Sequence, residues 1–325
     1  MNTFISQLGV LGPLICLALF LFASMVAVIR LEALSRQGVE GSVLGMIFMP
    51  FFSGVGNIAF AVILAMKHGD GNDVLTNCIF NNLTNLTLLI GVPMLIWSMS
   101  HIPDRQAWSA VCEFKISRLS NEMNLMAMFF FTLFLWLMTQ DGELSREDGW
   151  ILILLFAFWH CFHIYDVKKT NILKRKTYPK TLPVDIILLL FCSFVTYVTI
   201  DYLVVWFGGL DSAVISPRLL GWLSGVLMVL PNALLAIYYG SHRRMDVVYA
   251  SQVGDGHICI PFCMGLFAVI HPFAVGDFLS RTLFILMGLF CCHLIFIMIV
   301  PKFSRIFAAV FVAVFCVFVW LGLFR

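Results

Sequence analysis

Polar side chains that could bind a cation interrupt apolar stretches at two corresponding places in the chain. In the first, Asn57 is followed, after a short charged loop, by the run Asn81-Asn82-Leu83-Thr84-Asn85. In the second, Pro231-Asn232 is followed by Gly254-Asp255-Gly256-His257. Carboxylate, amide and hydroxyl oxygens are ligands that hard cations prefer. Because polar groups inside a membrane are costly unless they have a role, we expect one cation site built from both stretches.

The composition predicts an all-α polytopic membrane protein. Hydrophobic residues make up 61% and charged residues 12% of the 325 residues, and the mean hydropathy is +0.97. A water-soluble domain would carry about twice that charged fraction. A helix needs roughly 17–25 residues to cross the hydrocarbon core. Ten apolar runs of about this length are expected to be transmembrane helices: 8–29, 44–66, 77–98, 122–139, 149–166, 184–207, 218–240, 250–270, 280–300 and 304–324.

The distribution of basic residues predicts the orientation. Fifteen of the 20 Lys and Arg residues fall in the odd-numbered connections, and four fall in the even-numbered ones. Because cytoplasmic loops carry the excess of Lys and Arg, both termini are expected to be non-cytoplasmic. The formal net charge of +2 is therefore a signal of topology, and nucleic acid is not an expected partner. The compact length favours a plasma membrane of the bacterial inner-membrane type.

A charged connection divides the chain into two halves. We expect a first five-span repeat at 1–167, a basic cytoplasmic connection at 168–183 and a second five-span repeat at 184–325. Five spans per half is an odd number, so the second half must enter the membrane from the opposite side. The sequence therefore predicts two inverted five-helix repeats.

The polar stretches also contain residues that can break a helix. Pro50, Gly54 and Gly56 could break the second span, and Gly225 and Pro231 could break the seventh. A broken helix presents backbone dipoles that can help to bind an ion, provided that they line a cavity or contact protein. The alternative interpretation is that these small residues serve close packing between helices.

The pattern of these segments resembles the calcium:cation antiporter superfamily, whose members share the sodium/calcium exchanger membrane region. That family has two inverted five-span halves, each with a Gly-Thr-Ser-Leu-Pro-Glu helix break and a downstream Gly-Ser-Asn-x-x-Asn/Asp. Here Pro231-Asn232 lies where Pro-Glu would, Gly254-Asp255-Gly256 where Gly-Ser-Asn would, and Asn57 at the Glu position of the first half. Asn81-Asn82 fall at Ser-Asn, and Asn85 falls at the downstream Asn. The resemblance covers nearly the whole chain.

The departures from the family pattern concern the ion site. Asn57 and Asn232 replace both family carboxylates, Met228-Val229 replaces a Thr-Ser pair, and Cys259 occupies an acidic position. Carrying the family's ion-site roles across implies a set of candidate ligands: Ser53, Asn57, Asn81, Asn85, Asn232, Asp255 and Cys259.

The chemistry of this set favours a monovalent cation or a proton over Ca²⁺. Calcium takes six to eight oxygen ligands, several of them usually charged, and it matches sulfur poorly. The proposed site has one carboxylate, Asp255, which could alternate between a protonated and a cation-bound form. Two secondary candidates are His257, as a proton relay or a hydrogen-bonded neighbour, and Asp201, an acid within the sixth span. A soft-metal site of His257, Cys259 and Cys263 is a weaker interpretation, because positions 257 and 259 point to different helix faces.

These observations lead to one expected function and one alternative. The expected function is a secondary transporter of the cation-antiporter type that moves a monovalent cation, a proton or both by alternating access. The resemblance implies that spans 1 and 6 slide past a core of spans 2, 3, 7 and 8. The alternative is a non-transporting sensor, scaffold or subunit that keeps the fold, and a small polar organic solute also remains open as substrate. No catalytic or cofactor motif is present in the sequence, so an enzyme is not expected.

Overall fold

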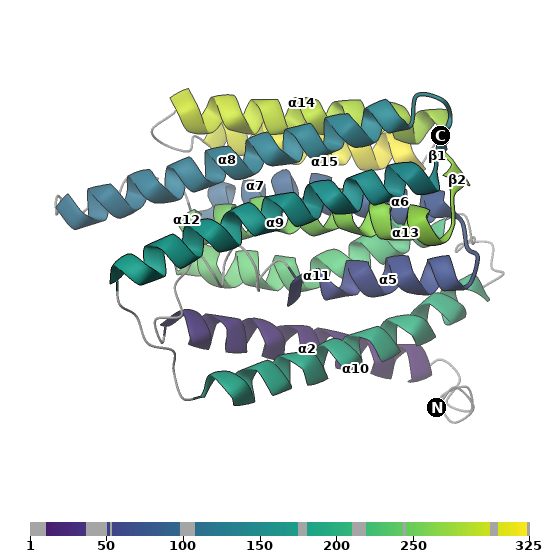
Figure 1. Ribbon diagram of the computed structural model, residues 1–325, viewed down its shortest axis with the longest axis horizontal. Coiled ribbons are helices and arrows are strands. Elements are labelled where there is room, and N and C mark those ends of the chain that lie inside the picture. The colour runs from purple at the N-terminus through teal and green to yellow at the C-terminus, as the bar shows by residue number, and fades with distance from the viewer. Residues whose placement is uncertain are drawn as a thin grey trace.

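The computed structural model describes residues 11–36, 51–52, 54–97, 108–174, 181–209, 219–242, 245–299 and 305–323. These form long helices that run roughly along one common axis, with two short strands at one end (Figure 1). Ser53, one of the predicted ligands, lies outside the described residues. The elements of the first half are α2 (Leu11–Arg36), α5 (Val55–Met66), α6 (Gly71–Leu86), α7 (Leu88–Trp97), α8 (Trp108–Met138), β1 (Glu143–Leu144) and α9 (Arg146–Lys174). Those of the second half are α10 (Leu182–Gly208), α11 (Leu220–Ser241), α12 (Met245–His257), η3 (Ile258–Cys263), α13 (Met264–Ile270), β2 (Phe273–Ala274), α14 (Asp277–Ile299) and α15 (Arg305–Leu323).

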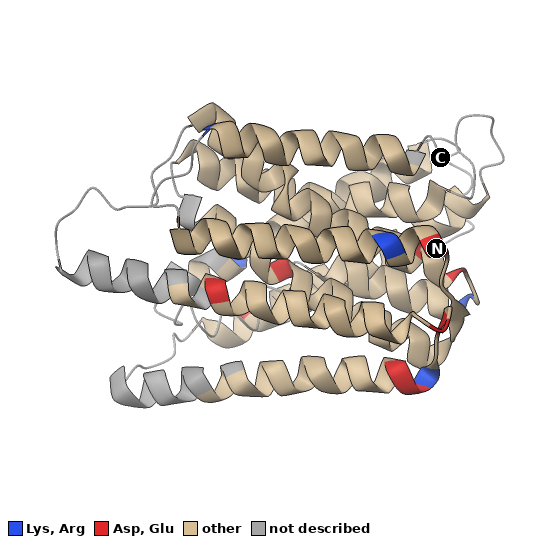
Figure 2. Ribbon diagram, turned by 90° about the horizontal axis from the view of Figure 1, so that it is seen from above, with Lys and Arg blue, Asp and Glu red and all other residues tan. Residues whose placement is uncertain are grey.

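The helices have the length and composition of a multi-pass membrane protein. Within the described residues, eight helical segments are long and apolar enough to cross a membrane, and the shorter α5 is also apolar. The expected count of ten is therefore not confirmed, although the all-helical membrane architecture is. Most of the Lys, Arg, Asp and Glu residues that the structure describes lie toward the two ends of the helix bundle (Figure 2).

One end of the bundle is defined by the pairing of the two strands, and we call it the strand end. β1 and β2 are antiparallel, with Glu143 opposite Ala274 and Leu144 opposite Phe273. The Asn72 side chain donates from Nδ2 to the Ala274 carbonyl at 2.9 Å. The Gly221 N–H donates to Asp73 Oδ1 at 3.1 Å. These contacts bring the starts of α6, α9, α11 and α14 together with the ends of α8 and α13.

The same contacts establish that the two halves are inverted. α8 ends at the strand end, whereas its counterpart α14 begins there. α13 ends at the strand end, whereas its counterpart α6 begins there. α11 begins at the strand end, and its counterpart α5 ends there, one helix before α6. Each pair of corresponding spans therefore runs in opposite directions, as inverted repeats require. The exact boundaries of the repeats remain a prediction.

Local chemistry fixes where several helices begin. Asp70 precedes α6 and accepts a hydrogen bond from the Asn72 N–H at 2.9 Å. Ser145 precedes α9 and accepts from the Asp148 N–H at 3.2 Å, while the Asp148 carboxylate accepts from the Ser145 N–H at 3.0 Å. This reciprocal cap satisfies N–H groups that have no partner inside the helix. Pro183 stands in the first turn of α10, where the missing N–H costs nothing.

The seventh span does not contain the break that the sequence predicts. α11 is continuous through both Gly225 and Pro231, so the expected break at these residues is wrong. A methyl group at Gly225 would lie 2.8 Å from the Phe80 ring, so this glycine serves close packing. Pro231 is tolerated because neighbouring helices can satisfy the backbone groups that a membrane proline frees.

Within the described residues, the third and eighth spans are interrupted, whereas Pro50 of the second span lies outside them. The third span is divided into α6 and α7 at Thr87, and the eighth contains the π-helical turn η3 with Pro261 inside it. π-helical turns are frequent at functional sites. α5 has only 12 residues and begins at Val55, so it covers part of a bilayer and leaves Asn57 in its first turn.

Candidate functional site

The predicted polar residues of the two halves meet at the carboxylate of Asp255. Asn232, on α11, donates from Nδ2 to Asp255 Oδ2 at 2.9 Å. Asn85, on α6, donates from Nδ2 to the same oxygen at 3.0 Å. All three side chains are buried, with exposed fractions of 4% or less. The fold therefore brings together residues 170 positions apart, on three helices, around one carboxylate.

Hydrogen bonds extend this arrangement into a cluster of amides. Asn85 Nδ2 also donates to Asn81 Oδ1 at 2.8 Å, one helical turn earlier on α6. Another turn earlier, Asn77 Nδ2 donates to Asn57 Oδ1 on α5 at 3.3 Å. We refer to the following residues as the polar cluster: Asn57, Asn77, Asn81, Asn85, Asn232 and Asp255.

Asp255 fixes the orientation of two amides in this cluster. Its Oδ2 accepts two hydrogen bonds, so Asn85 must present its NH₂ group there. The second hydrogen of that NH₂ group then requires the oxygen of Asn81 as its acceptor. As a consequence, the Asn85 oxygen and the Asn81 NH₂ group take no part in these hydrogen bonds.

Several amide atoms of the cluster have no hydrogen-bond partner among the described residues. These atoms are two NH₂ groups, of Asn57 and Asn81, and two carbonyl oxygens, of Asn77 and Asn85. The four side chains are 0–1% exposed. Buried polar groups are nearly always paired, so unpaired ones along one face of α6 are candidate contacts for an ion or for water. The oxygens could bind a cation, and the NH₂ groups need hydrogen-bond acceptors.

The cluster holds a single carboxyl group within the part of the chain that the structure describes. The buried residues there include two acids, Asp255 and Asp185, and no Lys or Arg. Asp185 lies on α10 and pairs with Arg30 at 3.9 Å, so it belongs to a different region. A buried carboxylate with amide donors on one oxygen and no buried cationic side chain is electrostatically suited to a singly charged guest.

Asn77 was not predicted from the sequence, although a signal for it exists. Asn77, Asn81 and Asn85 are spaced by four residues, which places them on one face of a helix. The motif comparison starts the polar run at Asn81, and it therefore misses the first turn of this face. Ser224 and Gln252 are further buried polar residues on α11 and α12 that the sequence analysis did not select.

Cys259 and His257, two further predicted residues, also contact groups that do not belong to the cluster. Cys259 is fully buried in η3, and its backbone carbonyl accepts from the Cys78 thiol at 3.2 Å. His257 donates from Nδ1 to the Gly254 carbonyl at 3.0 Å and stacks on Trp159 with ring centroids 5.7 Å apart. No group of three or more His, Cys, Asp or Glu side chains suited to a metal occurs in the described part of the chain. The soft-metal arrangement of His257, Cys259 and Cys263 therefore has no support from the geometry.

Asp201, the other secondary candidate, lies at the strand end of α10 rather than in the polar cluster. Its carboxylate forms an ion pair with Lys67, which caps the end of α5. Both side chains are partly exposed, at 33% for Asp201 and 40% for Lys67. The pair therefore joins two helices at the surface of one end, away from Asp255.

The break in the third span is held by two partners from other helices. His293 of α14 lies with Nε2 at 2.9 Å from the Leu86 carbonyl, at the end of α6. Its Nδ1 lies 2.9 Å from the Tyr249 hydroxyl of α12. A carbonyl only accepts, so Nε2 carries a hydrogen and donates it to Leu86. His293 therefore supports the helix end one residue after Asn85.

Comparisons with known proteins agree on the architecture. Residues 8–165 match the family model described as "Sodium/calcium exchanger protein". Among solved structures, the chain is similar to the sodium-calcium exchanger NCX_Mj soaked with 10 mM Na⁺ and zero Ca²⁺, with a TM-score of 0.68 and 17% identity over 100% of both chains. The same exchanger soaked with 2.5 mM Na⁺ and 10 mM Sr²⁺ gives a TM-score of 0.67 and 16% identity, again over 100% of both chains.

These matches differ in what they cover. The family model covers the first half, whereas the structural similarity extends over the whole chain and shows the exchanger fold. No curated protein matches the sequence.

Proposed function

We infer that this protein is a divergent member of the calcium:cation antiporter superfamily, because residues 8–165 match the exchanger family and the whole chain has the exchanger fold. We propose that it is a cation antiporter that moves a monovalent cation, a proton or both through the polar cluster. The observation that carries this proposal is the buried Asp255 carboxylate, bound by Asn85 and Asn232 from the two halves of the fold.

The charge of the cluster supports a monovalent guest. A divalent cation beside a single carboxylate would keep about one uncompensated positive charge in a site closed off from water, and burying such a charge is expensive. A monovalent cation or a proton leaves the cluster neutral. Ca²⁺ also requires six to eight oxygen ligands, whereas the cluster offers the carboxylate and a few amide oxygens.

The unpaired NH₂ groups support a guest that brings water with it. A bare cation could bind a free amide oxygen but would leave the NH₂ groups of Asn57 and Asn81 without acceptors. Water has both donor and acceptor capacity, and buried waters typically form about three hydrogen bonds. We therefore propose that the cation occupies the cluster together with at least one water molecule.

A non-transporting protein that keeps the fold is the competing function. Such a protein would have no need for unpaired amides in its interior, and apolar packing would stabilise it more. The convergence of both halves on Asp255 therefore favours transport. A plasma-membrane location, which derives from the compact length, remains part of the proposal. So do non-cytoplasmic termini, which derive from the excess of Lys and Arg in the odd-numbered connections.

Flux measurements in proteoliposomes test the proposal. Purified protein is reconstituted, and the uptake of Na⁺, K⁺ and Ca²⁺ tracers is followed with and without an opposing gradient of cation or pH. We expect counterflow of a monovalent cation or a proton that Asp255→Asn abolishes. Glu147→Gln removes the same charge from an exposed residue of α9 and serves as the matched control. Unchanged flux in Asp255→Asn, or Ca²⁺ flux that exceeds monovalent flux, would refute the proposal.

A further inference from the structure

Gln252 lies on the same face of α12 as Asp255. It precedes Asp255 by three residues, and Ser251 precedes Asp255 by four. α12 is one α-helix from Met245 to His257, so residues three and four apart are neighbours on its surface. Both Gln252 and Asp255 are 2% exposed. A second polar side chain therefore lies one helical turn from the carboxylate and is buried as deeply as the carboxylate.

Hydrogen bonds fix how the Gln252 amide is oriented. The Ser251 hydroxyl donates its hydrogen to the Val248 carbonyl at 2.9 Å. Gln252 Nε2 lies 3.1 Å from the same hydroxyl oxygen, which must therefore accept from the Gln252 NH₂ group. Around the helix axis, Ser251 and Gln252 lie on either side of Asp255. The bond between them therefore holds the amide on the Asp255 face of α12.

The oxygen of this amide, Gln252 Oε1, has no hydrogen-bond partner among the described residues. An amide oxygen can accept hydrogen bonds or bind a hard cation. Buried polar side-chain atoms are nearly always paired, and each exception needs an explanation such as a bound ion or water. The Gln252 oxygen thus has the same character as the unpaired oxygens of Asn77 and Asn85 in the polar cluster.

The spacing between Gln252 and Asp255 suits a small guest. Side chains three residues apart on a helix have Cβ atoms about 5–6 Å apart. One water between two oxygens spans up to about 5.5 Å, twice the usual hydrogen-bond distance between oxygens. A guest bound at Asp255 is therefore within reach of the Gln252 oxygen, either directly or through one water molecule.

Unpaired amide oxygens lie on both sides of the carboxylate along the bundle axis. α13 ends at the strand end, so α12, which leads into it through η3, runs toward that end. Gln252 is therefore farther from the strand end than Asp255 is. α6 begins at the strand end, so Asn77 lies closer to that end than Asn85, the residue that bonds Asp255. Gln252 extends the set of ligands in the direction that the polar cluster leaves uncovered.

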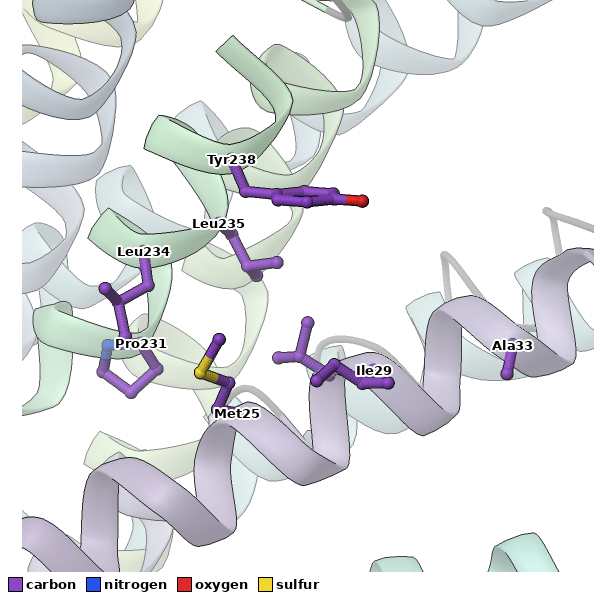
Figure 3. Close-up of a pocket in the computed structure, with 8 residues that line it drawn as sticks. Met25, Ile29, Ala33, Pro231, Leu234, Leu235 and Tyr238 are labelled. Carbon is purple, nitrogen blue, oxygen red and sulfur yellow. The ribbon is translucent and has the colours of Figure 1, made fainter. Parts of the chain in front are cut away.

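The cavity between α2 and α11 does not provide ligands of this kind. Its volume is about 410 Å³, and apolar side chains such as Met25 and Leu234 line most of it (Figure 3). Among its described lining residues, Tyr238 has the polar group, a hydroxyl that points away from Pro231 (Figure 3). Because a hard cation needs several oxygen ligands, a further position for it is expected on α12 and not in this cavity.

We propose that Gln252 forms a second binding position for the transported cation, one helical turn from Asp255 on the side away from the strand end. Its Oε1 is the ligand, and the cation brings water into this position as it does in the polar cluster. One carboxylate neutralises one monovalent charge, so a single cation exchanges between the two positions.

This inference rests on the proposed transport function and narrows its guest. The Gln252 amide has no titratable group, so it can bind a metal cation but does not take up a proton near neutral pH. The substrate class is therefore a hard monovalent metal cation, such as an alkali ion, and not a proton alone.

The test measures the cation dependence of the unfolding temperature of the purified protein. NaCl or KCl is titrated against choline chloride at constant ionic strength, and the concentration dependence gives an apparent affinity. Gln252→Met replaces the amide by an apolar side chain of similar length, and Gln252→Glu introduces a second carboxylate. Gln140→Met makes the same change at an exposed residue just after α8 and is the matched control.

We expect an alkali cation to stabilise the wild type in a saturable manner. Gln252→Met should weaken the apparent affinity about tenfold, the loss expected for one ligand oxygen. Gln252→Glu should strengthen it about tenfold, because the cation then lies between two carboxylates. Gln140→Met should match the wild type. An unchanged affinity in Gln252→Met would overturn the second position and assign its oxygen to water. If Gln252→Met does not fold, a Gln252→Glu variant without any gain in affinity overturns the inference instead.

The same titration separates this inference from the proposed function. Asp255→Asn should abolish the response, as the proposed function requires. If it does so while Gln252→Met keeps the affinity of the wild type, the proposed function stands and the second position is refuted. A wild type that responds to pH but to no alkali cation would also refute the second position, and it would leave a proton as the guest of Asp255.

Discussion

Asn232 and Asp255 lie on neighbouring helices, and the Asn232 amide donates to the Asp255 carboxylate at 2.9 Å. The family that the chain resembles has a Glu at the Asn232 position and a Ser at the Asp255 position, so in this chain the acid lies on α12 and its neutral partner on α11. The carboxylate is thereby held without a second charge. This relationship accounts for the expected preference for a singly charged guest.

Restoring the second acid should change the ion preference. In Asn232→Asp, two carboxylates would face each other and repel unless a cation or a proton lies between them. We expect this variant to gain stabilisation by Ca²⁺ that the wild type lacks, and to lose stability when divalent cations are removed. Thermal unfolding in the presence of each cation measures the effect, and a variant without any gain from Ca²⁺ would contradict it.

Asn77 should contribute to cation binding as much as the site residues that were predicted from the sequence. Asn77→Ala removes the hydrogen bond to Asn57 and one free oxygen of the cluster, so the apparent affinity for the carried cation should fall by about tenfold, the loss expected for roughly one hydrogen bond. Asn121→Ala, at a buried Asn of α8 outside the hydrogen bonds of the cluster, is the matched control. Equal affinities in the two variants would exclude Asn77 from the site.

His293 should stabilise the break between α6 and α7. His293→Phe leaves the Leu86 carbonyl buried without its donor, which costs about 1–3 kcal/mol of unfolding free energy. Tyr249→Phe removes the hydroxyl that bonds His293 Nδ1 and leaves the bond to Leu86 in place, so it should cost about 0.5–1.5 kcal/mol. Thermal or denaturant unfolding of both variants measures these differences. A larger loss in Tyr249→Phe than in His293→Phe would contradict the assigned roles.

Close packing of α9 on α13 should depend on two glycines. A methyl group at Gly149 would lie 2.8 Å from both the Gly265 carbonyl oxygen and the Val269 nitrogen, which are backbone atoms that cannot turn away. Gly149→Ala should therefore destabilise the protein by about 1–3 kcal/mol. Gly208→Ala, where an added methyl group has no neighbour within 4 Å, should be neutral or slightly stabilising. Similar unfolding temperatures for the two variants would be evidence against this packing.

The sequence was sufficient to predict an all-helical membrane architecture and to select three polar residues that meet in the structure. The excess of apolar residues predicts membrane helices, and the odd number of spans per half predicts the inversion that the strand pairing and helix-end contacts establish. Asn85, Asn232 and Asp255 all lie at motif positions of the two halves, and the fold brings these three residues together. These features depend on spacing and polarity, which a sequence displays directly.

Other features depended on contacts between distant segments. Pro231 suggested a break, yet α11 continues through it, whereas the eighth span is interrupted by a π-helical turn around Pro261. A proline removes one hydrogen bond in either case, and the neighbouring helices decide whether the helix opens. Asp201 was expected within the membrane, but the fold places it beside Lys67, a partner 134 residues away that no local pattern indicates.

The most direct test of the central claim is the cation-dependent stability of the purified protein with and without the Asp255 carboxylate. A ligand that binds only the folded state raises the unfolding temperature as its concentration increases. The unfolding temperature of the wild type should rise with a monovalent cation, or shift with pH if a proton is the guest, and should respond less to Ca²⁺. In Asp255→Asn these responses should disappear. A wild-type response dominated by Ca²⁺, or a monovalent response that survives in Asp255→Asn, would contradict the account.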